Sequence, residues 1–161
     1  MRRPLLLGLA LVVAGTGGVF AAELVLPEHP GTDQFDTSKA IWEIQDTFGQ
    51  MHVIECGGPE MWGRGMPEPT TGMVPVEIMA LNLQCSGGVT VHLDPNRPSM
   101  GQISKSGDRF FDVFFEIDGF PPGGGRQQVT NLQPVTLQAK IAHVPPYGAL
   151  YFNRAPVQLV D

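Results

Sequence analysis

The fold of this chain is constrained most strongly by a ten-residue run, Arg-Phe-Phe-Asp-Val-Phe-Phe-Glu-Ile-Asp, at positions 109–118. Every second residue of the run, at positions 111, 113, 115 and 117, is apolar, and the residues between them change from aromatic to acidic. This alternation predicts a β-strand with one face in a core and the other partly in water. A helix of this sequence would be apolar on all sides. Burial of the four inward side chains contributes on the order of 6–10 kcal/mol before entropy is subtracted.

The first 21 residues have the composition of a signal peptide. A basic start precedes an apolar stretch at positions 5–13, and small residues lead to Val19, Phe20 and Ala21, an A-x-A-like cleavage site. The apolar stretch is shorter than the roughly 20 residues of a membrane-spanning helix. We therefore expect residues 1–21 to be cleaved and the mature chain to be secreted or periplasmic, without membrane insertion. An ordinary secretory signal is favoured, and Arg2 and Arg3 leave a twin-arginine signal open.

Acidic residues dominate the charge of the chain. The formal net charge is −6, and cleavage after position 21 would remove two arginines and change it to −8. Such a chain repels nucleic acids and anionic membrane surfaces, so we expect neither as a partner. An unknown protein or a glycan is the expected partner. The remaining ~140 residues suffice for one domain with a real core.

The two cysteines, Cys56 and Cys85, are expected to form a structural disulfide. An even count in a chain bound for an oxidising compartment favours a bond, and the alternative is a pair of buried thiols. The two residues lack the Cys-x-x-Cys spacing of a redox centre.

Turns divide the chain into seven or eight short strands. Residues 22–39 are polar, acidic and proline-containing and predict a flexible entry segment. Residues 61–73 hold several glycines and prolines and predict a long exposed loop. No connection predicts a crossover helix, which excludes a parallel sheet. We predict a mostly-β domain over residues 40–161, a single antiparallel β-sandwich or barrel-like sheet pair.

No assembled catalytic set is recognisable. The sequence lacks a Gly-x-Ser-x-Gly nucleophile elbow, and its glycine-rich stretch at positions 122–126 lacks the strand-to-helix context of a phosphate loop. Asp112 and Glu116 are separated by roughly 13 Å along a strand, which is too far for a retaining glycosidase pair. They are expected to face solvent.

The strongest metal-ligand pattern is His92-x-Asp94, which puts an imidazole and a carboxylate on one strand face. Two ligands do not make a site, and a third would have to come from His52, His143 or an acid across the sheet. Copper on soft methionines and calcium in an acidic loop are further options, and no cofactor is expected. The residues concerned are Met61, Met66, Met73 and Met79 for copper, and Asp94, Asp108 and Asp118 for calcium.

Two aromatic residues are candidates for ligand binding. Trp62 lies in the glycine- and proline-rich segment, and Tyr147 follows two prolines. Aromatic side chains at loop tips of a β scaffold can stack on sugars or enter a partner's pocket. The alternative, which the sequence favours, is that both side chains fold back over an end of the sheet.

The stretch Phe-Phe-Asp-Val-Phe at positions 110–114 resembles a group of exported bacterial proteins of uncharacterised function. Those proteins carry a Ser-Phe-Phe-Asp-Val-Phe stretch, and here Arg109 takes the place of the serine. The similarity extends to Pro-Pro-Tyr-Gly at positions 145–148 and to a C-terminal strand. It covers residues 51–161 and implies a secreted β domain, with no catalytic residue to transfer.

Taken together, these patterns predict an exported, non-enzymatic β domain with a structural or binding role. A metal- or carbohydrate-binding module is the first alternative, and a hydrolase using loop acids is the second.

Overall fold

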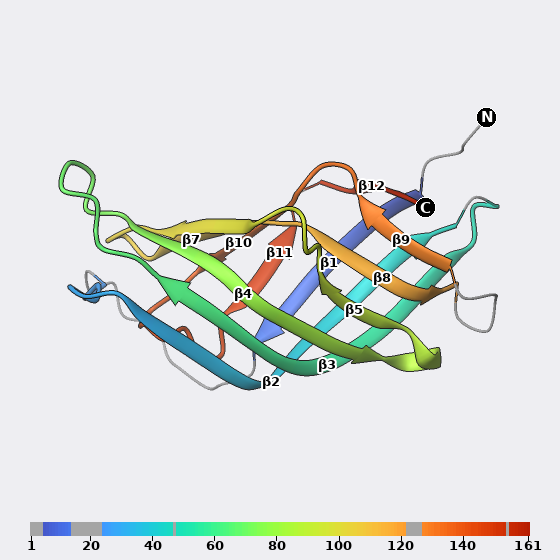
Figure 1. Ribbon diagram of the computed structural model, residues 1–161, viewed down its shortest axis with the longest axis horizontal. Coiled ribbons are helices and arrows are strands. Elements are labelled where there is room, and N and C mark those ends of the chain that lie inside the picture. The colour runs from blue at the N-terminus through green and yellow to red at the C-terminus, as the bar shows by residue number, and fades with distance from the viewer. Residues whose placement is uncertain (1–4, 14–23, 47, 122–126, 154) are drawn as a thin grey trace.

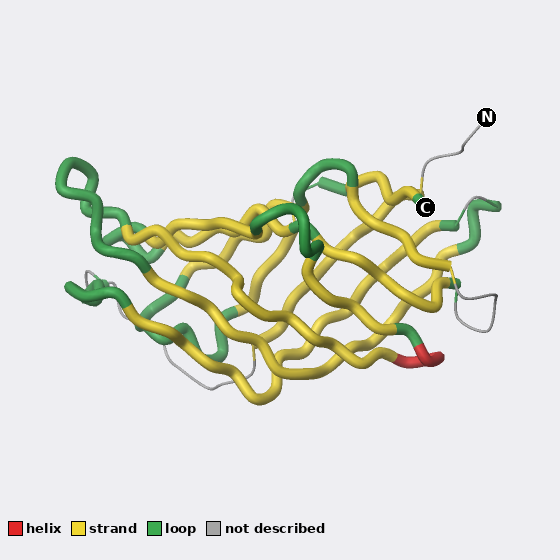
Figure 2. The backbone as a smooth tube through the Cα atoms, in the orientation of Figure 1, coloured by secondary structure: helices red, strands yellow, loops and turns green. Residues whose placement is uncertain are grey.

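The protein is described here by a computed structural model that covers residues 5–13, 24–46, 48–121, 127–153 and 155–161. Figure 2 shows that most of the described chain is β-strand, joined by loops, with a single 3-10 turn, η1 (Ser86–Gly88), as its helical part. The strands are β1 (Leu5–Val13), β2 (Gly31–Gln45), β3 (Met51–Arg64), β4 (Val74–Cys85), β5 (Thr90–Leu93), β6 (Ser99–Ile103), β7 (Asp108–Val113), β8 (Phe115–Phe120), β9 (Gln127–Asn131), β10 (Val135–Lys140), β11 (Leu150–Asn153) and β12 (Val157–Val160). The predicted mostly-β, antiparallel class is confirmed.

All twelve strands belong to one antiparallel sheet, in the order β11-β10-β7-β6-β4-β3-β2-β1-β12-β9-β8-β5. The strand at each end of this order has a second partner within the sheet. Strand β11 also pairs with β1, and β5 also pairs with β4. Strand β4 divides its length between two neighbours, with residues 74–78 beside β6 and residues 82–84 beside β5. Strand β1 likewise pairs with β12 near its start and with β11 near its end (Figure 1).

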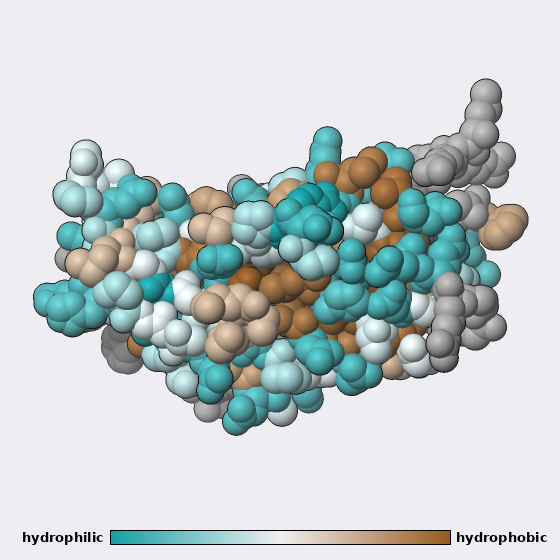
Figure 3. All heavy atoms as spheres, viewed as in Figure 1, coloured by the Kyte–Doolittle hydropathy of each residue, from teal (hydrophilic) through white to brown (hydrophobic). Residues whose placement is uncertain are grey.

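The core lies between parts of the sheet that face each other. Trp42 of β2 contacts Phe115 of β8, with ring centroids 4.7 Å apart, and Trp62 of β3 lies 5.1 Å from Phe111 of β7. Neither pair of strands is hydrogen-bonded together, so both contacts cross from one layer to the other. Figure 3 shows hydrophobic side chains in the middle of the molecule, with hydrophilic side chains around them.

The phenylalanine-rich run is extended, and its inward face is the predicted one. Phe111, Val113, Phe115 and Ile117 are all buried, whereas Phe110 is partly exposed. Continuous burial of these side chains on one face explains why the run is a strand and not a helix.

The run is nevertheless two strands, since β7 ends at Val113 and β8 begins at Phe115. Strand β7 pairs with β6 and β10, whereas β8 pairs with β5 and β9. Side chains replace the missing ladder bonds at this break. Ser99 Oγ accepts the Phe114 N–H at 2.9 Å, and the buried Asn131 accepts the Phe115 N–H and donates to the Val113 carbonyl.

The predicted flexible entry segment is wrong over residues 31–39, which form the first part of β2. Two of its polar residues, Asp33 and Ser38, are buried with partners. Asp33 accepts two hydrogen bonds from Arg64 of β3, at 2.8 and 3.1 Å, and Ser38 Oγ donates to Glu60 at 2.8 Å. The sequence pattern missed this strand because ion pairing, which no local period reveals, allows polar side chains to be buried there.

The predicted loop at residues 61–73 is also shorter than expected, because β3 continues through Gly63 to Arg64. Earlier in β3, Gly58 allows a close approach of the neighbouring backbone. A Cβ at Gly58 would lie 2.1 Å from the Asn82 carbonyl oxygen of the neighbouring strand β4. Residues 67–73 remain outside regular strands.

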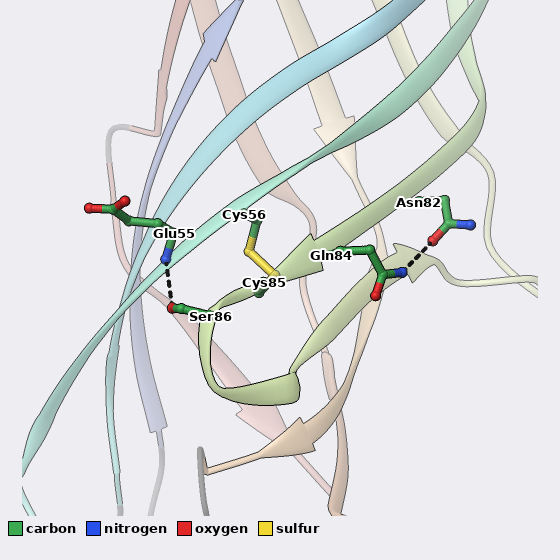
Figure 4. The surroundings of a disulfide bond; sticks show 6 residues. All are labelled: Glu55, Cys56, Asn82, Gln84, Cys85 and Ser86. Carbon is green, nitrogen blue, oxygen red and sulfur yellow. Dashed lines mark hydrogen bonds between the residues drawn. A yellow bond between two sulfur atoms is a disulfide. The ribbon is translucent and has the colours of Figure 1, made fainter.

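The predicted disulfide between Cys56 and Cys85 is present (Figure 4). The two residues are directly opposite each other in the β3–β4 ladder. Beside them, the Glu55 N–H donates to Ser86 Oγ at 3.3 Å, which ties η1 to β3. The bond therefore fixes the register of two long strands at one end of the sheet.

The apolar stretch of the predicted signal peptide forms β1, which pairs with β2 along residues 6–13. The predicted cleavage site lies outside the described residues, so cleavage stays a prediction. Among the described residues, no helix is long and apolar enough to cross a membrane.

Candidate ligand-binding site

Four neighbouring strands bring two exposed aromatic rings and two amides into one row on the outer face of the sheet. Gln102 of β6 is directly opposite Phe110 of β7, Phe110 is opposite Gln138 of β10, and Gln138 is opposite Phe152 of β11. Directly opposed residues in a sheet point to the same side. We call Gln102, Phe110, Gln138 and Phe152 the amide–aromatic row.

The row is accessible. Phe110 is 37% exposed and Phe152 is 53% exposed. The amides of Gln102 and Gln138 make no hydrogen bond to any other part of the chain that the structure describes. Their donors and acceptors are therefore free for a ligand.

The amide–aromatic row forms the floor of an open groove of about 980 Å³. Leu150 and Met73 add apolar surface, and Lys140 and Asp108 form an ion pair of 3.1 Å beside the row. Hydrogen bonds from Ser106 and Lys140 lower the pKa of Asp108 below its ordinary value. The groove thus combines flat apolar faces with polar groups at its rim.

This combination suits binding better than catalysis. Rings in alternate strands lie roughly 9–10 Å apart and present flat surfaces for stacking, and the amides between them can donate and accept hydrogen bonds. The lining residues include no histidine or cysteine, and the hydroxyl groups of Ser104 and Ser106 are hydrogen-bonded to each other and to Asp108.

The predicted metal ligands are not brought together. Asp94 is buried beside Arg97, whose guanidinium lies 2.6 Å from the Asp94 carboxylate, and it also accepts the Asn96 N–H. Burial raises the pKa of Asp94, but these hydrogen bonds outweigh that effect and lower it. The Asp94 carboxylate therefore accepts the hydrogen bonds of a turn, and no contact joins it to His92.

His92 instead lies between two acids of strand β8. Its Nε2 is 3.0 Å from Glu116 Oε2, and its Nδ1 is 3.6 Å from the Asp118 carboxylate. His52 pairs with Asp46, and His143 contacts the Pro145 carbonyl. Within the described ranges, no group of three His, Cys, Asp or Glu side chains could hold a metal ion.

The two predicted aromatic ligand-binding residues have different environments. Trp62 is not an exposed loop residue that could bind a ligand, since it is fully buried in β3, where its ring packs on Phe35 and Phe111. Tyr147 is 55% exposed, and its ring edge contacts Phe35 at the end of the core. Neither residue lines the groove beside the amide–aromatic row.

A buried charge in the core is a feature that sequence patterns missed. The Arg109 guanidinium lies inside the sheet, 4.0 Å from the centre of the Trp62 ring and 4.6 Å from that of Phe111. Burial lowers the pKa of Arg109 to about 10, partly opposed by the nearby Tyr151 and Glu60. Arg109 therefore stays charged at neutral pH, stabilised by the aromatic rings.

Glu60 shares this buried region, and it accepts hydrogen bonds from Ser38 and from the Trp62 indole N–H. Burial raises the pKa of Glu60 above its ordinary value, and these hydrogen bonds oppose the effect only in part. Between the ordinary pKa and the raised one, the folded protein keeps a proton that the unfolded chain releases. Stability then falls as the pH rises through this interval.

A Glu60→Gln variant tests this prediction, because glutamine keeps the shape and has no titrating proton. We expect its free energy of unfolding to increase relative to the wild type as the pH rises above the ordinary pKa of a glutamate, by up to about 1.4 kcal/mol per pH unit. Urea titrations at several pH values measure the difference. Glu77→Gln, an exposed glutamate of β4, is the matched control and should leave the pH dependence unchanged. Parallel pH profiles for Glu60→Gln and the wild type would contradict the prediction.

No known protein family, curated protein or solved structure matches this chain. The resemblance to exported bacterial proteins therefore stays a prediction.

Proposed function

We propose that this protein is an exported, non-enzymatic domain that binds an extended glycan along the amide–aromatic row. The observation that carries the proposal is the alternation of amide, ring, amide and ring across four adjacent strands. A sugar chain has flat apolar faces that stack on aromatic rings and hydroxyl groups that pair with amides. Because the row crosses four strands and the groove is open, an extended chain fits better than a compact ligand.

The charge of the protein agrees with a neutral ligand. The chain carries a formal charge of −6, and the one ion pair beside the row, between Lys140 and Asp108, is internally balanced. An acidic polymer would be repelled by the protein as a whole. Export, which the signal-like first 21 residues predict, would place the domain where glycans are abundant.

A glycan array followed by calorimetric titration of the best neutral ligand tests the proposal. Phe152→Ala removes a stacking surface, and we expect about a tenfold weaker affinity, or about 1.4 kcal/mol. Phe48→Ala is the matched control, because Phe48 is 92% exposed in the β2–β3 connection, outside the groove. Affinity should not change in this control.

Two results would contradict the proposal. One is equal loss of affinity in Phe152→Ala and Phe48→Ala, since it would place the binding surface elsewhere. The other is release of shortened sugars on prolonged incubation, detected by chromatography, since it would make the protein a hydrolase.

A further inference from the structure

Strand β1 joins three strands at once. Its residues 5–7 pair with β12, its residues 10–12 pair with β11, and its residues 6–13 pair with β2 (Figure 1). On that side, β2, β11 and β12 have no other partner among the described strands. Without β1, all three would present unpaired backbone N–H and C=O groups.

The sequence predicts that the exported protein loses this strand. Residues 1–21 have the composition of a cleaved signal peptide, and β1 lies entirely within them. The mature chain would then hold a slot that is one strand wide, with β2 on one side and β11 and β12 on the other. We call this the β1 slot.

The inner side of the β1 slot is apolar. Residues 7, 9 and 11 of β1 are directly opposite Ile44, Trp42 and Ala40 of β2, which are all buried in the core. Directly opposed side chains point to the same face, so a strand in the slot needs an apolar residue at every second position.

The outer side of the β1 slot is also bordered by apolar residues. Ile41 of β2 is 40% exposed, and Leu150 and Phe152 of β11 are about half exposed. Two of them are directly opposite β1 residue 10, Ile41 from one side and Phe152 from the other. A strand that is apolar on both faces therefore matches the slot, and Leu-Leu-Leu-Gly-Leu-Ala-Leu-Val-Val of β1 is such a strand.

We propose that the exported protein accepts an apolar β-strand of a second, different polypeptide in the β1 slot. Strand addition of this kind gains affinity from backbone hydrogen bonds and specificity from alternate side chains. The donor is not a second copy of the mature chain, since beyond residue 21 this sequence has no other uninterrupted apolar run of nine residues. The proposal rests on the export part of the proposed function and is independent of glycan binding.

The test uses the full chain, expressed with export and purified, with its N-terminus determined by mass spectrometry. The probe is a peptide with the sequence of residues 5–13 and lysines at both ends for solubility. We expect saturable binding, with slower amide hydrogen exchange at residues 38–45 of β2 and in β11 and β12. A peptide with lysine at the positions of Leu7, Leu9 and Leu11 should bind at least tenfold more weakly. A peptide with serine at the positions of Leu6, Ala10 and Val12 should still bind.

Each alternative result is decisive. Retention of residues 1–21 in the exported protein, protection of the β2 edge without peptide, or a dimer formed through that edge would overturn the proposal. If the exported chain unfolds without cooperativity, the peptide must restore a cooperative transition, and failure to do so overturns the proposal as well. Glycan titration of the same sample measures the proposed function separately. A failure of peptide binding can therefore be told apart from a failure of glycan binding.

Discussion

Replacing Phe111 with alanine is expected to lower the free energy of unfolding by about 3–5 kcal/mol, the usual cost of a large aromatic side chain removed from a core. Phe111 is 1% exposed, and its ring contacts the rings of Trp62 and Tyr151 and the guanidinium of Arg109. Its loss leaves a cavity and removes one wall of the environment that stabilises a buried charge. Urea unfolding followed by tryptophan fluorescence measures the effect, because Trp62 lies against the site.

The neighbouring Phe110→Ala is the control, with the same change one residue away on the opposite face of β7. We expect a loss of stability below about 1 kcal/mol there, because the side chain is already 37% exposed. Binding should show the reverse order, since Phe110 belongs to the amide–aromatic row and Phe111 does not. Equal stability losses in the two variants would contradict the assignment of the two faces of β7.

Removing the disulfide, with Cys56→Ala and Cys85→Ala together, is expected to cost roughly 3–4 kcal/mol. The bond closes a loop between residues 29 apart in sequence, and its loss increases the freedom of the unfolded chain. It also frees the end of the β3–β4 ladder. Urea midpoints of the variant, and of the wild type with and without reductant, measure the contribution.

Ser86→Ala is the control for local effects at the disulfide. It removes the 3.3 Å hydrogen bond from the Glu55 N–H beside the bond and keeps both cysteines, so we expect a change below about 1 kcal/mol. Unchanged stability in the cysteine double variant would contradict this prediction. The β3–β4 ladder alone would then hold the register, and the bond would have no stabilising role.

Sequence patterns were most informative where burial follows a local period. The alternation at residues 110–117 correctly identified Phe111, Val113, Phe115 and Ile117 as inward, since a strand that covers a core buries every second side chain. The disulfide was also predicted correctly. Each of these features depends on residues that are close in sequence or on a single pair of cysteines.

Sequence patterns failed where the burial or hydrogen bonding of a residue depends on partners that are distant in the sequence. Asp33 and Ser38 read as polar entry-segment residues, but Arg64 and Glu60 pair with them and allow their burial. Gly58 reads as a turn residue, but the backbone of β4 passes too close for a side chain. The break at Phe114 was equally hidden, because the side chains of Ser99 and Asn131 supply the replacement hydrogen bonds.

The sequence predicted part of the candidate site. Alternation placed Phe110 on the outer face, and the same period placed Gln138 outward on its own strand. The amino-acid sequence by itself thus determined the mostly-β class, the inner and outer faces of the phenylalanine-rich run and the acidic charge of the chain. Only the tertiary structure decided that Gln102, Phe110, Gln138 and Phe152 form one row, and that β1 lies between β2 and two later strands. The reason is physical, since neighbours across a sheet come from distant parts of the chain and their pairing depends on the packing of the whole core.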